Sequence, residues 1–260
     1  MKTKEEIFEI EDVLKIVIEV AYLLLINGAE VRRVEDTMLR ICSSYKLKNP
    51  EVFAISSLII ITATSKDGKT ITQTKRVYGT QTNLMAFEDA NALSREICTT
   101  PKSLEYVLEI SNKIQENSSK AKWKMRAGYI IAASSCSMLS GGNFSDALSA
   151  IIVSLILIFG NTYILKQNSN KVVYTFSISF LMGLCSIVLV NLGIGSHVDK
   201  IIIGDIMLLI PGMALINSIT DIFCGDLMTG TTRITESLLT AFAIAVGFLF
   251  AFILTGGTVQ

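Results

Sequence analysis

The chain has 260 residues, half of them hydrophobic, and a formal net charge of zero at pH 7. This balance, without a basic stripe, argues against a nucleic-acid-binding protein. A single histidine, His197, and five scattered cysteines without a CxxC pair argue against histidine metal centres, Ser-His-Asp triads and disulfide frameworks, so we expect neither a metal nor a cofactor.

Two amphipathic helices are predicted first. Apolar residues recur at helical spacing over residues 7–26, and Asn27-Gly28 ends the pattern because both residues tolerate left-handed backbone. Lys15 and Glu19 interrupt the first apolar stretch, which argues against a secretory signal. The second helix is expected over residues 31–45.

A β-hairpin is predicted next. Residues 51–64 are rich in Ile, Val, Phe and Thr, residues 65–69 form a turn, and residues 70–78 have β-branched residues at nearly every other position. The apolar run Leu58–Ile61 is too short to cross a bilayer, which favours a buried strand.

Two further helices are expected at residues 83–97 and 103–115, the latter following Pro101. Residues 117–120 are interpreted as a short linker. The front of the chain is therefore predicted to be an α+β domain with one hairpin and about four helices.

Charged residues become rare after Arg126. Residues 1–119 carry 15 of the 23 Lys and Arg and 17 of the 23 Asp and Glu, whereas Asp146 is the only charge between Ala127 and Leu165. A membrane span needs about 20 mostly apolar residues. Five segments are predicted as spans: Met125–Leu139, Phe144–Leu165, Val172–Ile194, Ile201–Ile219 and Ser237–Leu254.

The fold class is therefore a membrane protein with a cytoplasmic α+β domain at residues 1–119 and an all-α bundle of five transmembrane helices at residues 120–260. A globular core of apolar helices is the rival interpretation, but it needs a larger polar shell than this chain supplies.

Orientation follows from the basic residues that flank the spans. With the front domain in the cytoplasm, only Lys200 lies on an outer flank. The inner flanks then hold Lys120, Lys122, Lys124, Arg126, Lys166, Lys171 and Arg233. We expect a cytoplasmic N-terminus and an external C-terminus.

Particular strings occur in a specific order in both parts of the chain. The front part has Asn27-Gly28-Ala29-Glu30-Val31, Val34-Glu35, Arg40, Glu51-Val52-Phe53, Arg76, and Asn91 with Ser94-Arg95. The back part has Ile210-Pro211-Gly212-Met213-Ala214-Leu215, Asn217, Asp221, Gly225-Asp226, Gly230, Arg233 and Glu236. Over essentially the whole chain these strings resemble the threonine/serine exporter family.

The resemblance is closest to the short form of that family, in which the exporter is split in two. It implies a protein of a prokaryotic plasma membrane that exports small hydrophilic metabolites, namely threonine and serine or succinate, and that is not an enzyme. It also implies a partner, a smaller membrane subunit with four helices, and leaves a homo-oligomer open. A lipid bilayer and a small-molecule substrate are the other expected partners.

The break at Pro211-Gly212 is the main candidate site. Discontinuous helices of transporters expose backbone groups near the bilayer midplane, where they can hold a charged solute. We favour a substrate or coupling site over a simple kink, and expect it to comprise Pro211, Gly212, Asn217, Asp221, Asp226 and Arg233.

Carboxylates in or beside this span have two interpretations. Either Asp221 or Asp205 is a coupling group that takes up a proton, because burial raises the proton affinity of a carboxylate. The alternative is a solvated interfacial set with Arg233 in a surface ion pair with Asp226 or Glu236. Asp146 lies at a predicted helix start, where a helix cap is a better interpretation than a functional carboxylate.

A second candidate site in the cytoplasmic domain comprises Glu30, Glu35, Arg40, Arg76 and Arg95, which the resemblance highlights. Charged residues on a helix face are usually only solvated. Gly28, in the corner at residues 27–30, is explained by the backbone conformation that the corner requires, without a ligand. The alternative is that the domain gates the cytoplasmic opening of the transport pathway or collects substrate at that opening.

Three functions remain open. A subunit of a proton-coupled secondary exporter explains the spans and the broken helix. An intramembrane aspartyl hydrolase is suggested faintly by Gly204-Asp205 and Gly225-Asp226, but the two aspartates are predicted near opposite membrane faces. A membrane-anchored sensory or regulatory protein is the third possibility, and it lacks a glycine-rich phosphate loop.

Overall fold

A computed structural model describes residues 9–64, 68–120, 122–163 and 170–256. The chain forms two compact units. The first comprises Met1–Lys120 together with Met213–Ile234, and the second comprises Ala121–Gly212 together with Thr235–Gln260. The assignment of residues 1–119 and 120–260 to cytoplasm and membrane stays a prediction.

The first two predicted helices are confirmed in the first unit. α1 is Ile10–Ile26 and α2 is Val31–Ser44. α1 is buried over most of its length because the sheet packs on it from one side and the later helices pack on it from the other. Gly28 in the corner between α1 and α2 has a φ of 96°, which suits glycine and explains why the corner can turn so sharply.

The sheet has three strands in the order β1-β2-β3, all antiparallel: β1 is Lys48–Ile55, β2 is Leu58–Thr64 and β3 is Thr70–Arg76. The predicted hairpin around residues 65–69 is confirmed by the pairing of β2 with β3. The prediction of one strand over residues 51–64 is wrong, because Ser56 and Ser57 form a tight turn within it. Ile55 therefore pairs with Leu58.

Alternation along β2 buries one of its faces. Ile59, Ile61 and Ala63 are all completely buried, as expected for the central strand of a sheet covered by helices on one side. The expectation of a buried strand at Leu58–Ile61 is confirmed.

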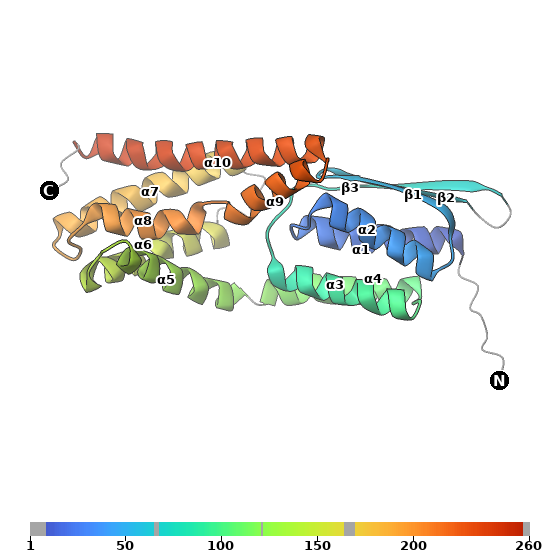
Figure 1. Cartoon of the computed structure of the whole chain (residues 1–260). Coiled ribbons are helices and arrows are strands. Elements are labelled where there is room, and N and C mark those ends of the chain that lie inside the picture. The colour runs from blue at the N-terminus through green and yellow to red at the C-terminus, as the bar shows by residue number, and fades with distance from the viewer. Residues whose placement is uncertain (1–8, 65–67, 121, 164–169, 257–260) are drawn as a thin grey trace. The chain divides into compact units, whose positions relative to one another are not determined.

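Two further helices complete this part: α3 is Leu84–Thr99 and α4 is Leu104–Lys120. Figure 1 shows α1 and α2 between the sheet on one side and α3 with α4 on the other. The predicted linker at residues 117–120 is wrong, because α4 continues to Lys120. The segment contains neither proline nor glycine, so nothing in it stops the helix.

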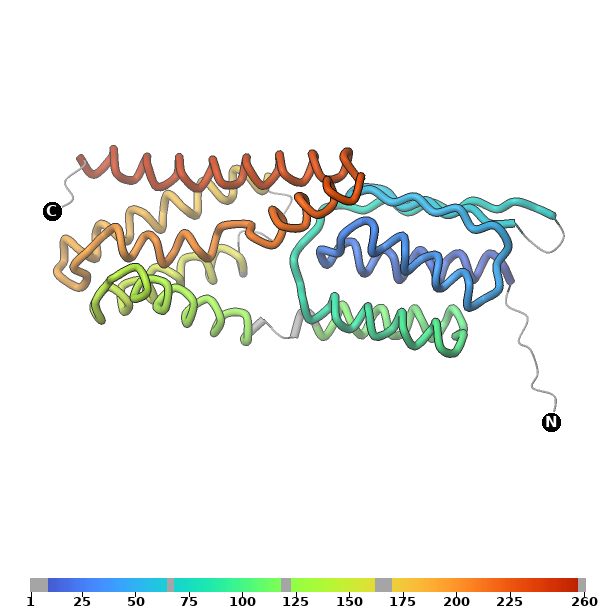
Figure 2. Tube along the Cα trace, in the orientation of Figure 1, coloured from blue at the N-terminus to red at the C-terminus, as the bar shows by residue number. Residues whose placement is uncertain are grey.

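The second unit contains α5 (Lys122–Leu139), α6 (Phe144–Tyr163), α7 (Lys171–Asn191), α8 (Val198–Leu209) and most of α10 (Leu227–Leu254). The tube in Figure 2 follows these helices. Gly183 and Gly247 lie where α7 meets α10, and a Cβ at Gly183 would come within 2.8 Å of the Ala251 side chain. The absence of a side chain at these two positions lets α7 and α10 pack closely.

Three helices of the described part of the chain are long and apolar enough to cross a membrane: α6, α7 and α10. The pair α8 and α9 (Gly212–Phe223) is bent at a short break and makes a fourth if it crosses as one span. α5 does not meet the same criteria, since it starts with Lys122, Lys124 and Arg126. A fifth span at Met125–Leu139 stays a prediction.

The break in the predicted fourth span is confirmed, since α8 ends at Leu209 and α9 begins at Gly212. Pro211 has no amide N–H, so the carbonyl of Met207 loses its usual helical partner. The Gly212 amide donates to Ile210 at 2.9 Å rather than to Leu208. The last turn of α8 therefore ends in carbonyl groups that the helix itself does not satisfy.

Candidate functional site

Three of the predicted site residues meet at the corner between α1 and α2, within the first unit. The Arg233 Nη1 atom donates to Asp221 Oδ2 at 2.8 Å, and Arg233 Nη2 donates to the carbonyl of Ala29 at 3.1 Å. The backbone N–H of Val31 donates to Asp221 Oδ1 at 3.1 Å, and Asn217 Nδ2 donates to the carbonyl of Gly28 at 2.8 Å. We call Asn217, Asp221 and Arg233, with the backbone of residues 28–31, the corner cluster.

Local geometry brings the three side chains together. Asn217 and Asp221 are four residues apart on α9 and so share one face of the helix. Gly225, with a φ of 98°, turns the chain into α10, which carries Arg233. Gly230 lets the two helices approach, since a Cβ there would lie 2.8 Å from the carbonyl oxygen of Ser218.

The cluster is a buried ion pair at a helix start. Asp221 is 1% exposed and Arg233 is 7% exposed. Glu30, the N-cap residue of α2, makes no side-chain capping bond, and the Asp221 carboxylate accepts from Val31, the first residue of that helix. The positive end of the helix dipole favours a carboxylate at this point, so Asp221 acts as a cap supplied from a distant part of the chain.

This geometry corrects one expectation. Arg233 does not form the solvated surface pair considered from the sequence; its ion pair is with Asp221, in the interior. Asp226 stands apart from the cluster at the start of α10, where its backbone N–H donates to the Asp221 carbonyl at 2.9 Å. Pro211 and Gly212 lie at the helix break, at the end of a segment of the second unit.

The five front-domain candidates do not form one site. Glu35 accepts a hydrogen bond from the Ala54 amide at 2.8 Å and so ties α2 to β1, and its burial raises the pKa of the Glu35 carboxyl. Arg40 and Arg95 are exposed, and Arg76 lies 5.2 Å from the ring centre of Tyr78. Glu30 is the N-cap residue of α2, and the five residues are dispersed over the domain.

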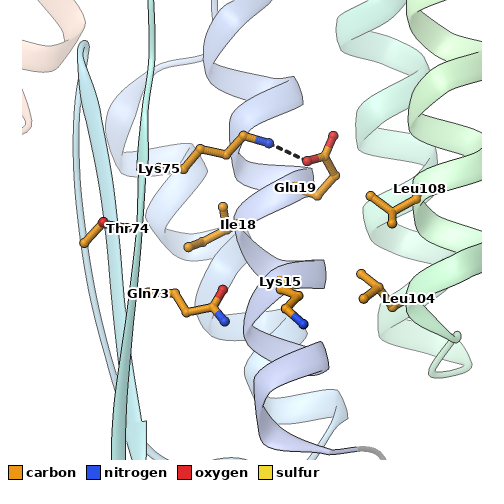
Figure 3. A pocket seen from close by; sticks show the side chains of 8 residues that line it. All are labelled: Lys15, Ile18, Glu19, Gln73, Thr74, Lys75, Leu104 and Leu108. Carbon is orange, nitrogen blue, oxygen red and sulfur yellow. Dashed lines mark hydrogen bonds and ion pairs between the residues drawn. The ribbon is translucent and has the colours of Figure 1, made fainter.

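A pocket of about 280 Å³ lies between α1, β3 and α4, and the sequence did not indicate it. Figure 3 shows Lys75 reaching across it to Glu19, at 2.5 Å. Lys15, also on its wall, pairs with Asp12 at 3.1 Å. Both lysines are thus engaged with carboxylates, which makes the pocket a poor site for an anionic solute.

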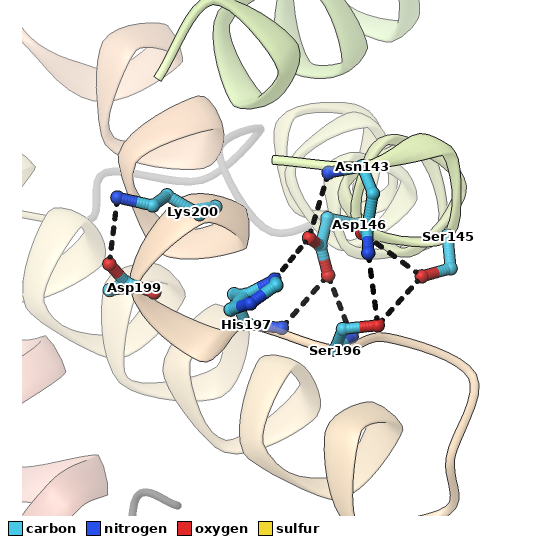
Figure 4. A network of polar contacts seen from close by, with 7 residues as sticks. All are labelled: Asn143, Ser145, Asp146, Ser196, His197, Asp199 and Lys200. Carbon is cyan, nitrogen blue, oxygen red and sulfur yellow. Dashed lines mark hydrogen bonds and ion pairs between the residues drawn. The ribbon is translucent and has the colours of Figure 1, made fainter. Parts of the chain in front are cut away.

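A polar network surrounds Asp146 in the second unit. Its carboxylate is completely buried and accepts from the Asn143 amide at 3.0 Å, which confirms the predicted cap at the start of α6. It also accepts from the amides of Ser196 and His197 at 2.7 and 2.9 Å and contacts His197 Nδ1 at 2.9 Å. Figure 4 shows these contacts converging on the carboxylate, which thereby holds the loop before α8.

Asp205 is the other buried carboxylate of the second unit. It lies in α8, is completely buried, and neither of its oxygens has a hydrogen-bond partner among the described residues. The sequence indicated Asp205 only as one of two coupling candidates, because its burial depends on how α5, α6 and α7 surround α8.

The family model described as "Putative threonine/serine exporter" matches residues 15–255. The chain therefore belongs to the threonine/serine exporter (ThrE) family, as the resemblance predicted.

Two curated relatives are similar along nearly their whole length. Both are named "Probable succinate transporter subunit YjjP". The one from Klebsiella aerogenes is 23% identical over 251 residues, covering 94% of each chain. The one from Escherichia coli strain K12 is 23% identical over 247 residues, covering 94% of this chain and 95% of the relative. No solved structure matches the chain. The chain is a multi-pass membrane protein of a transporter family.

Proposed function

We propose that the chain is one subunit of a secondary transporter that exports small hydrophilic metabolites bearing a carboxylate, either threonine and serine or succinate, coupled to proton movement. The family match and the names of the two relatives support both solute classes. Each solute is small and charged and needs polar contacts inside the bilayer.

The break between α8 and α9 is the observation that carries this proposal. It leaves the carbonyls of Met207 and Leu208 without their helical amide partners and places a new helix start at Gly212. Half-helix ends of this kind hold substrates and coupling ions in transporters with discontinuous helices. Pro211 and Gly212 are therefore the proposed solute contacts.

The corner cluster has a different proposed role. Asn217 and Asp221 belong to α9, which follows the break directly, and they bind the corner between α1 and α2. Movement of that corner would be passed to α9 through these bonds. We assign Asn217, Asp221 and Arg233 to this mechanical connection, with Asp226 at the turn that joins α9 to α10.

We further propose five spans, a cytoplasmic N-terminus and an external C-terminus in a prokaryotic plasma membrane, with a smaller four-helix subunit completing the pathway. The excess of basic residues on the inner flanks supports this orientation. The relatives' description as subunits supports a partner. The hydrolase alternative receives no support, since an aspartyl dyad would place a second carboxylate within hydrogen-bond distance of Asp205.

The test is efflux from cells that express this chain with and without its four-helix partner, loaded with labelled threonine, serine or succinate. We expect efflux of at least one solute only when both proteins are present. Pro211→Ala should slow it because alanine lets the helix continue through the break. Pro101→Ala, between α3 and α4, is the matched control. Retention of all three solutes by cells with both proteins would refute the proposal.

A further inference from the structure

The buried polar side chains of the second unit point to a site that the solute contacts do not include. Among the described residues, the buried side-chain oxygens without any hydrogen-bond partner belong to Ser137, Ser149 and Asp205. These three residues lie on α5, α6 and α8, which pack against one another. The unsatisfied groups therefore gather in one helical core instead of being scattered through the molecule.

Of these three residues, Asp205 is the one whose ionised side chain cannot stay buried without a partner. An ionised carboxylate that is fully buried without a partner is strongly unfavourable, by several kcal/mol or more, whereas a neutral acid or a carboxylate with a bound cation is tolerated. Its complete burial and its two unpartnered oxygens thus call for a positively charged ligand.

The surroundings of Asp205 favour a cation too. Asp205 lies about one turn before the end of α8, where the carbonyls of Met207 and Leu208 have lost their helical partners. The carboxyl end of a helix carries a partial negative charge. A proton or metal ion at Asp205 would therefore be stabilised by the helix end as well as by the carboxylate.

Within the described part of the chain, no cationic side chain from a neighbouring helix bonds the Asp205 carboxylate. α5 meets α8 at Gly204 through Ala133 and Ser137, neither of which titrates. α7 contributes the thiol of Cys185, which is within electrostatic range of Asp205. On α6, Asp146 is already engaged by His197.

The acidic, thiol and imidazole side chains near Asp205 favour a proton over a metal ion. No group of three or more His, Cys, Asp or Glu residues able to hold a metal occurs in the described ranges, and a sodium or magnesium ion needs about six oxygen ligands. A proton needs only one carboxylate oxygen.

We propose that Asp205 is the proton-binding residue of the transport cycle, which deepens the proposed function and rests on it. A proton taken from water on one side of the membrane forms an O–H bond with a carboxylate oxygen of Asp205, and the same bond breaks when the proton passes to water on the other side. No electrons are transferred, and no bond to the solute forms. The neutral state is the one that the closed core accommodates.

Reconstituted vesicles containing this chain and its four-helix partner test the proposal. Asp205→Asn keeps the size of the side chain and imitates the protonated acid. Asp199→Asn is the matched control, because Asp199 lies on the same helix but is 59% exposed and pairs with Lys200. We expect Asp205→Asn to reduce accumulation of labelled succinate or threonine driven by a pH gradient to the level of protein-free vesicles. Exchange of labelled for unlabelled solute should continue, and Asp199→Asn should behave as wild type.

A second measurement does not depend on transport. Infrared difference spectroscopy of the purified full chain should show the carbonyl stretch of a protonated carboxylic acid, and Asp205→Asn should remove it while Asp199→Asn leaves it. Persistence of that band in Asp205→Asn, or undiminished proton-driven accumulation, would overturn the assignment. Accumulation driven by a sodium gradient instead would overturn it as well. If wild-type vesicles move none of the solutes, the proposed function fails, and the infrared band alone decides whether Asp205 carries the proton.

Discussion

The Arg233 guanidinium lies 2.8 Å from the Asp221 carboxylate, and both side chains are almost completely buried. Arg233 also holds the Ala29 carbonyl, and Asp221 also holds the Val31 amide. The pair thus binds the backbone on both sides of Glu30 and fixes the corner between α1 and α2 to the helices at the other end of the sequence.

Breaking this pair should destabilise the first unit. Arg233→Leu leaves a buried carboxylate with only one amide donor, which we expect to lower the free energy of unfolding by about 3–5 kcal/mol. Thermal unfolding of the purified chain in detergent measures the loss. Lys113→Leu, which removes an exposed pair with Glu109 on α4, is the control and should change stability by less than about 1 kcal/mol. Equal effects of the two substitutions would contradict the structural role of Arg233.

Glu35 should make the stability of the folded protein decrease as pH rises from the acid range. Burial raises the pKa of its carboxyl above the value in the unfolded chain, despite the Ala54 amide bond, which opposes the shift. The folded state then binds more protons than the unfolded state between the two pKa values. The stability contribution of Glu35 is therefore greatest at acid pH and falls as pH rises through the folded pKa.

Glu35→Gln removes this titration and retains an oxygen that can accept from Ala54. We expect the variant to gain stability over wild type as pH rises from the acid range to neutrality. Melting temperatures across that range measure the difference. Glu88→Gln, at an exposed position of α3, is the control. A difference between Glu35→Gln and wild type that does not change with pH would rule this prediction out.

Gly204 should be intolerant of a side chain. A Cβ at this position would lie 2.6 Å from the Ala133 carbonyl oxygen, which is backbone and cannot move aside without shifting α5. Gly204→Ala should therefore cost about 1–3 kcal/mol. Gly128→Ala on α5, where a Cβ meets nothing within 4 Å, is the matched control and should stabilise by up to about 1 kcal/mol. Detergent melting curves that rank the two variants in the opposite order would contradict the close contact of α5 with α8.

The Asp146 network should depend on the carboxylate more than on the imidazole. Asp146→Ala removes the acceptor from the amides of Asn143, Ser196 and His197. Each of these part-buried hydrogen bonds to a charged acceptor contributes about 1.5–3 kcal/mol. His197→Ala removes only the exposed ring. Thermal unfolding should therefore show a clearly larger loss for Asp146→Ala, and equal losses would mean that the amide bonds contribute little.

Local chemistry explains which parts of the fold were predictable. The helices of the first unit follow from apolar spacing, and the break at Pro211 follows from the missing proline N–H, since both signals lie within a few residues. The turn at Ser56-Ser57 was missed because two serines are a weak turn signal inside a long β-rich run. The extension of α4 was missed because a polar segment was taken for a linker.

The site was predictable in its members but not in its arrangement. Asn217, Asp221 and Arg233 stood out because polar groups beside a span are costly. Their partners are backbone groups at Gly28, Ala29 and Val31, and every residue carries such groups, so no side-chain pattern identifies them. The burial of Asp205 likewise depends on three other helices.

The capping of α2 by Asp221 also bears on the order of biosynthesis. Val31 and Asp221 are 190 residues apart, so the ribosome has completed α2 long before its cap emerges. Until Asp221 has been synthesised, the corner between α1 and α2 lacks this cap, while the helices encoded between α2 and α9 are being inserted. Closure of that corner is thus a late step of maturation, which a chain truncated before Asp221 cannot complete.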